Sequence, residues 1–219
     1  MFSRLRRTKP LWGLVLLCAA LSAAYAQDLP KTFFLVARPG MPDPNFRETV
    51  VLATENELSQ VVGVIVNRPT TRSLAELLPG DRFKRFIDPL YFGGPVEPGG
   101  VFAVFRAERP PGETIGMLPG VHLALHPDTV YSLIGSPPAD IRFFAGYSGW
   151  ASGQLRGEIE RGDWFIAEAD ADAVFRRDTS ALWQDMLRRA SAVRANATTG
   201  REPRFQESIS DAQEHTPGG

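Results

Sequence analysis

Short apolar runs rich in β-branched residues alternate with turn-forming segments along the chain, and they predict a fold built on a β-sheet. Residues 33–37 (F-F-L-V-A), 49–54 (T-V-V-L-A-T) and 61–66 (V-V-G-V-I-V) have the length and composition of buried strands. Glu55-Asn56-Glu57 separates the second run from the third, which predicts a hairpin or two neighbouring strands. Further strands are predicted over residues 101–105, 121–125, 141–145 and 164–167.

Helices are predicted between these strands. The S-L-A-E run that begins at Ser73 fits a capping box, and it predicts a short helix that ends at Pro79. Residues 179–190 form an amphipathic pattern with Leu182, Met186 and Leu187 on one face. Shorter helical segments are predicted over residues 129–134, 155–161 and 169–175. Because strands and helices interleave irregularly, the pattern predicts an α+β fold rather than a regular parallel sheet.

Glycine and aromatic residues are concentrated in the predicted loops. Residues 146–155 read G-Y-S-G-W-A-S-G-Q-L, a composition that suits neither a helix nor an ordinary strand. We expect the rest of the fold to hold this segment in a special shape. Residues 91–96 (Y-F-G-G-P-V) are a second glycine-rich aromatic loop, and residues 109–120, with three prolines and three glycines, are a third loop.

The two ends of the chain differ from the predicted domain. Residues 1–26 have a basic start, an apolar run over residues 11–21 and the A-Y-A motif of a signal peptide cleaved after Ala26. The apolar run is shorter than the roughly 20 residues of a spanning helix; an uncleaved anchor and a misassigned start codon are the alternatives. The expected organisation is a signal peptide (1–26), one α+β domain (27–192) and a disordered C-terminal tail (193–219) of small, polar and charged residues.

Removal of the signal peptide changes both the cysteine content and the charge. Cys18 is the only cysteine, so the mature chain has no thiol for a disulfide, cysteine catalysis or a thiolate metal site. The whole chain has 24 basic and 25 acidic residues, and the first 26 residues hold four basic and no acidic ones. The mature chain therefore has 20 basic against 25 acidic residues, a formal charge of −5. This charge argues against non-specific binding to nucleic acid.

Five stretches, in this order, resemble the YqgE/AlgH family of small bacterial proteins. They are F-L-V-A-R-P-G-M-P-D-P-N-F (34–46), G-V-I-V-N-R-P (63–69), L-Y-F-G-G-P-V (90–96), the 146–155 segment and D-W-F (163–165). The resemblance implies an α+β fold, a single domain with a bent, partly barrel-like mixed β-sheet flanked by helices. It implies no settled biochemical activity, and the transcriptional-regulator label of some members rests on no recognisable DNA-binding motif. The segment ahead of Phe33 and the tail depart from the usual family pattern.

Two groups of residues invite comparison with catalytic or metal sites. Ser148 lies in a sequence like the G-x-S-x-G nucleophile elbow, but Trp150 replaces the final glycine, which favours a tight structural turn over a catalytic serine. His122 and His126 have a spacing that suits a metal site on a helix. Their segment alternates like a strand, however, and would hold the two side chains roughly 13 Å apart. We therefore expect no catalytic constellation, no metal and no cofactor.

Three other features admit both a binding role and a structural role. Arg68, in the N-R-P turn after the third apolar run, suits a carboxylate or phosphate, or it locks the turn to a nearby acid. The Gly93-Gly94 pair either approaches a ligand closely or turns the chain. The R-F-K-R-F run (82–86) contacts nucleic acid or an acidic partner, or it is a solvated helix face with its aromatic side chains turned inward.

Several of these residues belong to loops that are expected to meet at one edge of the sheet. We call this set the loop patch: Arg38, Asn67, Arg68, Gly93, Gly94, Tyr147 and Trp150. A few polar groups on an aromatic floor suit a small anionic or peptide ligand; the alternative is that these residues only knit the loops together. The expected function is an exported, periplasmic or secreted, non-enzymatic binding or regulatory module for such a ligand or an unknown protein partner. A nucleic-acid-associated transcriptional regulator is the alternative, and a hydrolase-like enzyme the second alternative.

Overall fold

The computed structural model describes residues 31–198, from the start of β1 (Thr32–Ala37) to the end of α6 (Leu182–Thr198). The predicted signal peptide, its cleavage site and residues 199–219 of the predicted tail lie outside the described residues. Within residues 31–198, no helix combines the length and the apolar character needed to cross a membrane.

The first three predicted strands form one half of the sheet, and the expected hairpin is confirmed. β1 pairs antiparallel with β2 (Val50–Glu55), which pairs antiparallel with β3 (Val61–Ile65). β10 (Trp164–Glu168) joins the other side of β1, also antiparallel. The residues of β1 and β2 are almost all buried, as expected for continuous apolar strands that are covered on both faces.

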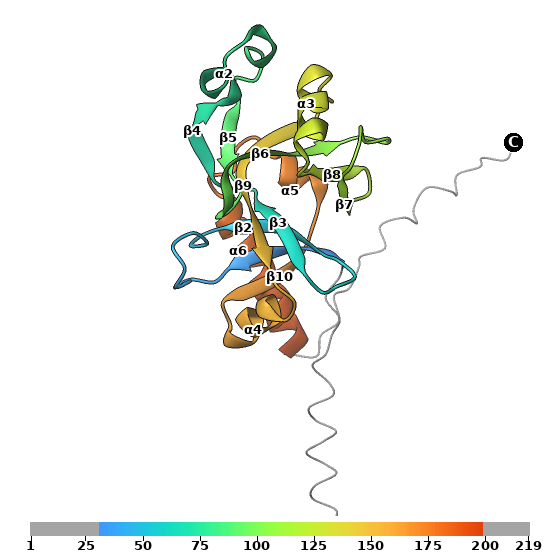
Figure 1. The fold of residues 1–219 in the computed structure, drawn as a ribbon. Coiled ribbons are helices and arrows are strands. Elements are labelled where there is room, and N and C mark those ends of the chain that lie inside the picture. The colour runs from blue at the N-terminus through green and yellow to red at the C-terminus, as the bar shows by residue number, and fades with distance from the viewer. Residues whose placement is uncertain (1–30, 199–219) are drawn as a thin grey trace, which may run out of the picture. The chain divides into compact units, whose positions relative to one another are not determined.

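β9 (Ile141–Trp150) joins this half of the sheet to the other half (Figure 1). Its last residues pair with β3, and its earlier residues pair with β6 (Val96–Arg106), which continues to β8 (Val121–Ala124) and β7 (Ile115–Leu118). β5 (Pro89–Phe92) pairs parallel with β9 and antiparallel with β4 (Pro69–Ser73). The result is a curled, mostly antiparallel sheet in a single α+β domain.

Helices cover both faces of the central strands. In β6, Phe102 and Val104 pack into a core with α5 (Ala171–Phe175) and α6. The alternate residues Ala103 and Phe105 face a second core that includes α3 (Pro127–Gly135), α2 (Leu74–Leu77) and the 3-10 helix η2 (Asp81–Phe83). Because successive side chains of a strand point to opposite faces, one continuous apolar run supplies both cores. A further helix, α4 (Gln154–Arg161), lies between β9 and β10 in the chain.

The local signals for helices are confirmed. The Ser73 N–H donates to Glu76 Oε2 over 3.4 Å, within the capping box that opens α2. Leu182 and Met186 on α6 are buried, and Leu187 packs beside them. The cap of α3 is His126, whose Nδ1 accepts from the Asp128 N–H over 3.3 Å.

The glycine-rich segments require corrections to the expected elements. Residues 146–150 continue β9, so the expectation that this segment does not form a strand is wrong. The predicted loop over residues 91–96 includes the end of β5 and the start of β6, and the predicted loop over residues 109–120 contains β7. In each case pairing with a neighbouring strand prevails over weak local propensity. α6 also continues to Thr198, past its expected end at Ala190 and into the expected tail.

Candidate functional site

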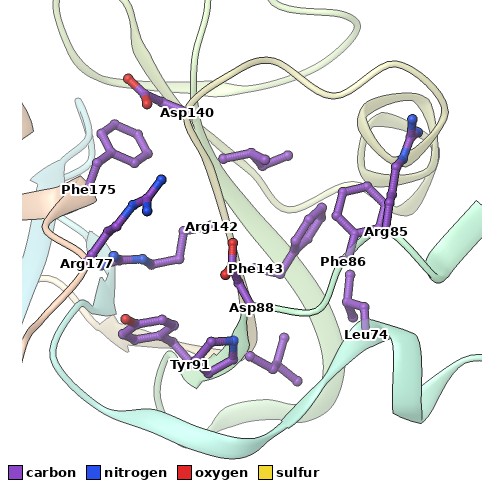
Figure 2. Close-up of a pocket in the computed structure, with 13 residues that line it drawn as sticks. Leu74, Arg85, Phe86, Asp88, Tyr91, Asp140, Arg142, Phe143, Phe175 and Arg177 are labelled. Carbon is purple, nitrogen blue, oxygen red and sulfur yellow. The ribbon is translucent and has the colours of Figure 1, made fainter.

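A cavity of about 300 Å³ lies where β5 diverges from β9, beside the end of α5. We call it the Arg142 cavity, after the arginine of β9 that contributes to its wall. In Figure 2 the labelled side chains form two groups around it, with Arg142, Arg177, Tyr91 and Phe175 in one group. Asp88 lies between that group and the apolar wall formed by Phe86, Phe143 and Leu74.

Arg142 fixes this side of the cavity. Its guanidinium Nη1 donates to the carbonyls of Val174 (2.6 Å) and Val66 (3.3 Å), and Nη2 donates to the carbonyl of Arg176 (2.7 Å). These bonds tie β9 to the end of α5, next to Phe175 and Arg177. The side chain is only 9% exposed. Burial lowers the pKa of Arg142, and the nearby Tyr91 and Asp88 oppose that shift.

The face of Tyr91 supports the Arg142 guanidinium, which lies 4.2 Å from the ring centroid. Such cation–π contacts are stronger where the cation is withdrawn from water. Tyr91 is only 5% exposed, yet within residues 31–198 its hydroxyl has no hydrogen-bond partner. A phenol that lines a cavity without a partner can donate to a bound group.

The two exposed charges of the cavity also lack partners in the described part of the chain. The Arg177 guanidinium and the Asp88 carboxylate make no hydrogen bond or ion pair with residues 31–198. The other charged lining residues are engaged. Arg85 donates to the carbonyls of Ile134 and Gly135 at the end of α3, and Asp140 pairs with Arg106 over 2.9 Å. The Arg142 cavity therefore offers one cation, one anion and one phenol to a ligand.

Sequence reasoning did not select Arg142, Arg177 or Asp88. The signal for Arg142 is an arginine inside an otherwise apolar strand, in I-R-F-F-A (141–145), since a buried charge needs partners. No comparable signal marks Asp88 or Arg177, because both lie in connecting segments and reach the cavity only through the tertiary fold.

The structure places four residues of the loop patch around residues 38–49, the loop between β1 and β2. Arg68 donates to the carbonyls of Asn45 (2.5 Å) and Arg47 (2.7 Å). Partial burial lowers the pKa of Arg68, and the charge of Glu48 opposes the shift. Asn67 accepts from the Val50 N–H and donates to the Glu48 carbonyl.

Arg38 and Trp150 also make internal contacts. The Arg38 guanidinium donates to the Gly162 carbonyl (3.1 Å) and lies over the ring of Phe165. Trp150 stacks on Phe46 of the 38–49 loop, with 5.6 Å between ring centroids. The indole N–H groups of Trp150 and Trp164 both donate to Glu158 Oε2, each over 2.9 Å. These contacts match the alternative in which the residues knit the loops together; ligand binding at the loop patch stays a prediction.

The other three residues of the loop patch meet at the junction of β5, β6 and β9. A Cβ at Gly93 would lie 2.2 Å from the Gly146 carbonyl oxygen, and one at Gly94 would lie 2.3 Å from Ser148 Oγ. The glycines therefore let two backbone segments approach closely. Tyr147 packs edge-on against Phe102, at 5.3 Å between centroids. Tyr147 and Trp150 lie within β9, not in a loop as expected.

The remaining candidates also have structural partners. Ser148 is fully buried, and its hydroxyl donates to the Gly93 carbonyl over 2.9 Å. His122 lies on β8, as the alternating pattern predicts, and its Nε2 is 3.0 Å from the Ala107 carbonyl. In the R-F-K-R-F run, Phe83 is buried and Phe86 packs on Phe143.

Comparison with known proteins assigns the family. A family model described as AlgH-like matches residues 34–193. A UPF0301 protein from Myxococcus xanthus is 36% identical over 171 residues, which cover 76% of this chain and 94% of that protein. A UPF0301 protein from Chlorobium phaeobacteroides is 35% identical over 158 residues, 70% of this chain and 83% of that protein.

The fold has solved counterparts as well. The solution structure of the AlgH protein from Pseudomonas aeruginosa aligns with a TM-score of 0.60 at 24% identity, covering 86% of this chain and 98% of that chain, which shows a shared fold. A crystal structure of a protein from Corynebacterium diphtheriae aligns with a TM-score of 0.59 at 25% identity, covering 77% of this chain and 92% of that one. The chain therefore belongs to the AlgH-like family, the YqgE/AlgH family that its motifs resemble.

Proposed function

We propose that this protein is an exported, non-enzymatic binding module that holds a small ligand with an anionic group in the Arg142 cavity. The observation that carries the proposal is a pair of donors without partners among residues 31–198, the Arg177 guanidinium and the Tyr91 hydroxyl, beside a fixed, buried Arg142. A cavity of about 300 Å³ is at the small end of the range for ligand pockets, which usually combine apolar walls with a few polar groups.

The charges that line the cavity favour an anion. Three arginines and two aspartates line it, and Asp140 is paired with Arg106, outside that set. Arg142 keeps its charge because an arginine side chain stays protonated in proteins. A charged group that enters a partly enclosed site interacts with these cations more strongly than it would in bulk water. Arg177 is free to form a bidentate pair with a carboxylate or phosphate.

The contacts of the catalytic candidates support binding rather than catalysis. The Ser148 hydroxyl is buried and committed to a backbone carbonyl, so it is not placed as a nucleophile. His122 lies 3.0 Å from a backbone carbonyl, and His126 caps α3. The proposal that the protein is exported rests on residues 1–26, which have a basic start followed by an apolar run and the A-Y-A motif.

The test is native mass spectrometry of the protein isolated from its own cells, compared with two variants. We expect a bound small anion on the wild type and its loss from Arg177→Ala. The matched control is Arg156→Ala, which removes an exposed arginine of α4 that does not line the cavity. Retention of the same ligand by Arg177→Ala, or its loss from both variants, would contradict the proposed site.

The nucleic-acid alternative makes a different prediction. It requires a salt-dependent shift of DNA at near-physiological ionic strength. Phe83 and Phe86, the aromatic side chains of the basic run, pack into the domain and are not offered to bases for stacking. We expect no such shift; a clear one would favour the regulator over the small-ligand module.

A further inference from the structure

Resting on the proposed function, we propose that the ligand of the Arg142 cavity is a short peptide with free ends. It lies extended along β9, with its carboxylate at Arg177 and Tyr91 and its ammonium group at Asp88. Within the described part of the chain, the cavity combines an open strand edge with two charges of opposite sign that have no partner.

The open strand edge follows from the pairing of β9. Residues 141–145 pair with β6 on one side. On the other side, β5 pairs only as far as Tyr91 opposite Phe144 and Phe92 opposite Ala145. Before Phe144, no strand of the described chain forms a pair with this side of β9, and residues 141–143 line the cavity.

The hydrogen bonds of β9 show which of its main-chain N–H and C=O groups face this edge. The Ala145 carbonyl accepts from the Gly93 N–H on the β5 side, whereas the Asp140 carbonyl accepts from the Arg106 N–H on the β6 side. Main-chain groups of successive strand residues point to opposite sides. Phe143 and Ile141, two and four residues before Ala145, therefore direct theirs toward the β5 side. The parallel pairing of Tyr91 opposite Phe144 already joins the Phe143 carbonyl to the Tyr91 N–H, so the part of the edge left for a ligand is the main chain around Ile141. An extended peptide can pair with such an edge and add a short strand.

The two free charges distinguish a peptide from a simple anion. Arg177 and the Tyr91 hydroxyl provide donors for a carboxylate. The Asp88 carboxylate repels a second negative charge and offers a partner to an ammonium group. A fully anionic ligand such as phosphate would satisfy only the first of these groups, whereas the zwitterion satisfies both.

The size and the walls of the cavity suit a short chain. An extended peptide spans about 3.5 Å per residue, so a cavity of about 300 Å³ accommodates only a few residues. The side chains of Leu74, Phe86 and Phe175 provide apolar surface along it. We therefore expect recognition of the main chain and both ends, with a preference for apolar side chains.

The test is isothermal titration of the purified protein with alanyl-leucine and two blocked forms, the N-acetylated peptide and the C-terminal amide. We expect the free peptide to bind at least about tenfold more tightly than either blocked form, the factor of a lost charged contact. Asp88→Asn should bind the free and N-acetylated peptides with similar affinity. Arg177→Gln should bind the free peptide and its amide with similar affinity, and Arg156→Ala should behave like the wild type.

The outcomes separate the peptide inference from the proposed function. If inorganic phosphate or acetate binds in an Arg177-dependent manner and the peptides do not, the peptide inference is wrong and the anion site stands. If the blocked peptides bind as tightly as the free one to the wild-type protein, recognition of the ends is wrong. If neither the peptides nor the anions bind, both proposals fail.

Discussion

Replacing Gly93 by alanine tests the close backbone approach that joins the two glycine-rich motifs. A Cβ at this position would lie 2.2 Å from the Gly146 carbonyl oxygen, about 1.2 Å closer than the 3.4 Å of an ordinary contact. Because the obstructing atom belongs to the backbone, it cannot turn aside as a flexible side chain would. The segment around Gly93 or that around Gly146 must shift.

The hydrogen bonds of Gly93 set the scale of the effect. Its N–H donates to the Ala145 carbonyl, and its carbonyl accepts from the Ile65 N–H and from Ser148 Oγ, each over 2.9 Å. Overpacking costs about 1–3 kcal/mol, and each weakened hydrogen bond costs about 1 kcal/mol. We expect Gly93→Ala to lower the free energy of unfolding by about 3–5 kcal/mol, a large part of a typical domain's stability.

Urea unfolding followed by tryptophan fluorescence measures this loss. The control is Gly99→Ala in β6, where an added Cβ meets no atom within 4 Å and the backbone φ is not positive. We expect the control to stay within about 0.5 kcal/mol of the wild type. If the two variants unfold within 1 kcal/mol of each other, on the order of measurement scatter, the reasoning about the glycine junction is refuted.

Further predictions concern the loops, an ion pair and processing. Trp150→Ala should lose about 3–5 kcal/mol of stability in chemical denaturation, because a buried, stacked indole is removed; a loss below about 1 kcal/mol would contradict this. Arg68→Ala should lose about 1–3 kcal/mol from its two carbonyl bonds and keep ligand binding; lost binding with intact stability would restore the loop patch as the site. A hydrogen bond from Arg176 lowers the pKa of Asp185. The stability that the ionised Asp185 carboxylate gives to the folded protein is therefore present above about pH 4 and disappears as the pH falls further. Asp185→Asn should therefore flatten the acid limb of a stability–pH curve, and an unchanged limb would contradict the assignment. Intact-mass analysis of protein from its own cell envelope should show loss of the first 26 residues, whereas the full-length mass would contradict export.

Local patterns were sufficient for the elements whose causes are local. The β-branched runs over residues 49–54 and 61–66 predict β2 and β3, since apolar strands covered on both faces have that composition. The S-L-A-E run predicts the start of α2, since a capping box involves only neighbouring residues. The strands β4, β5 and β7 were not predicted, because their segments are short or rich in proline and glycine and depend on a paired neighbour.

The glycine-rich segment of β9 illustrates the same limit. Glycine in a strand usually indicates weakness, which led to the expectation of a loop. In the structure, the backbone of Gly146 has a φ of +69°. A Cβ added at this residue would lie 2.3 Å from the Gly94 carbonyl oxygen. The glycine at position 146 is required by the close approach of the backbone at Gly94, although some 50 residues separate the two in the chain. Such a requirement is visible only once the two segments are known to meet.

The candidate site depends still more on tertiary structure. The carbonyls that hold Arg142 belong to residues 66, 174 and 176, which lie in two distant segments of the chain. The residues of the loop patch were selected because their loops were expected to meet at one edge of the sheet, and the side chains of Arg38, Arg68 and Trp150 are engaged within the domain. The sequence motifs therefore identify the framework of the fold, whereas the Arg142 cavity emerges only from the way that framework is assembled.

Amide chemical-shift mapping of the ¹⁵N-labelled protein tests most directly whether the Arg142 cavity is the binding site. Phosphate and alanyl-leucine are titrated separately into the same sample. With at least one of them, the largest shifts are predicted at Asp88, Tyr91, residues 141–143 and Arg177. Shifts confined to residues 38–49, or no saturable shift at the cavity with either ligand, would contradict the central claim.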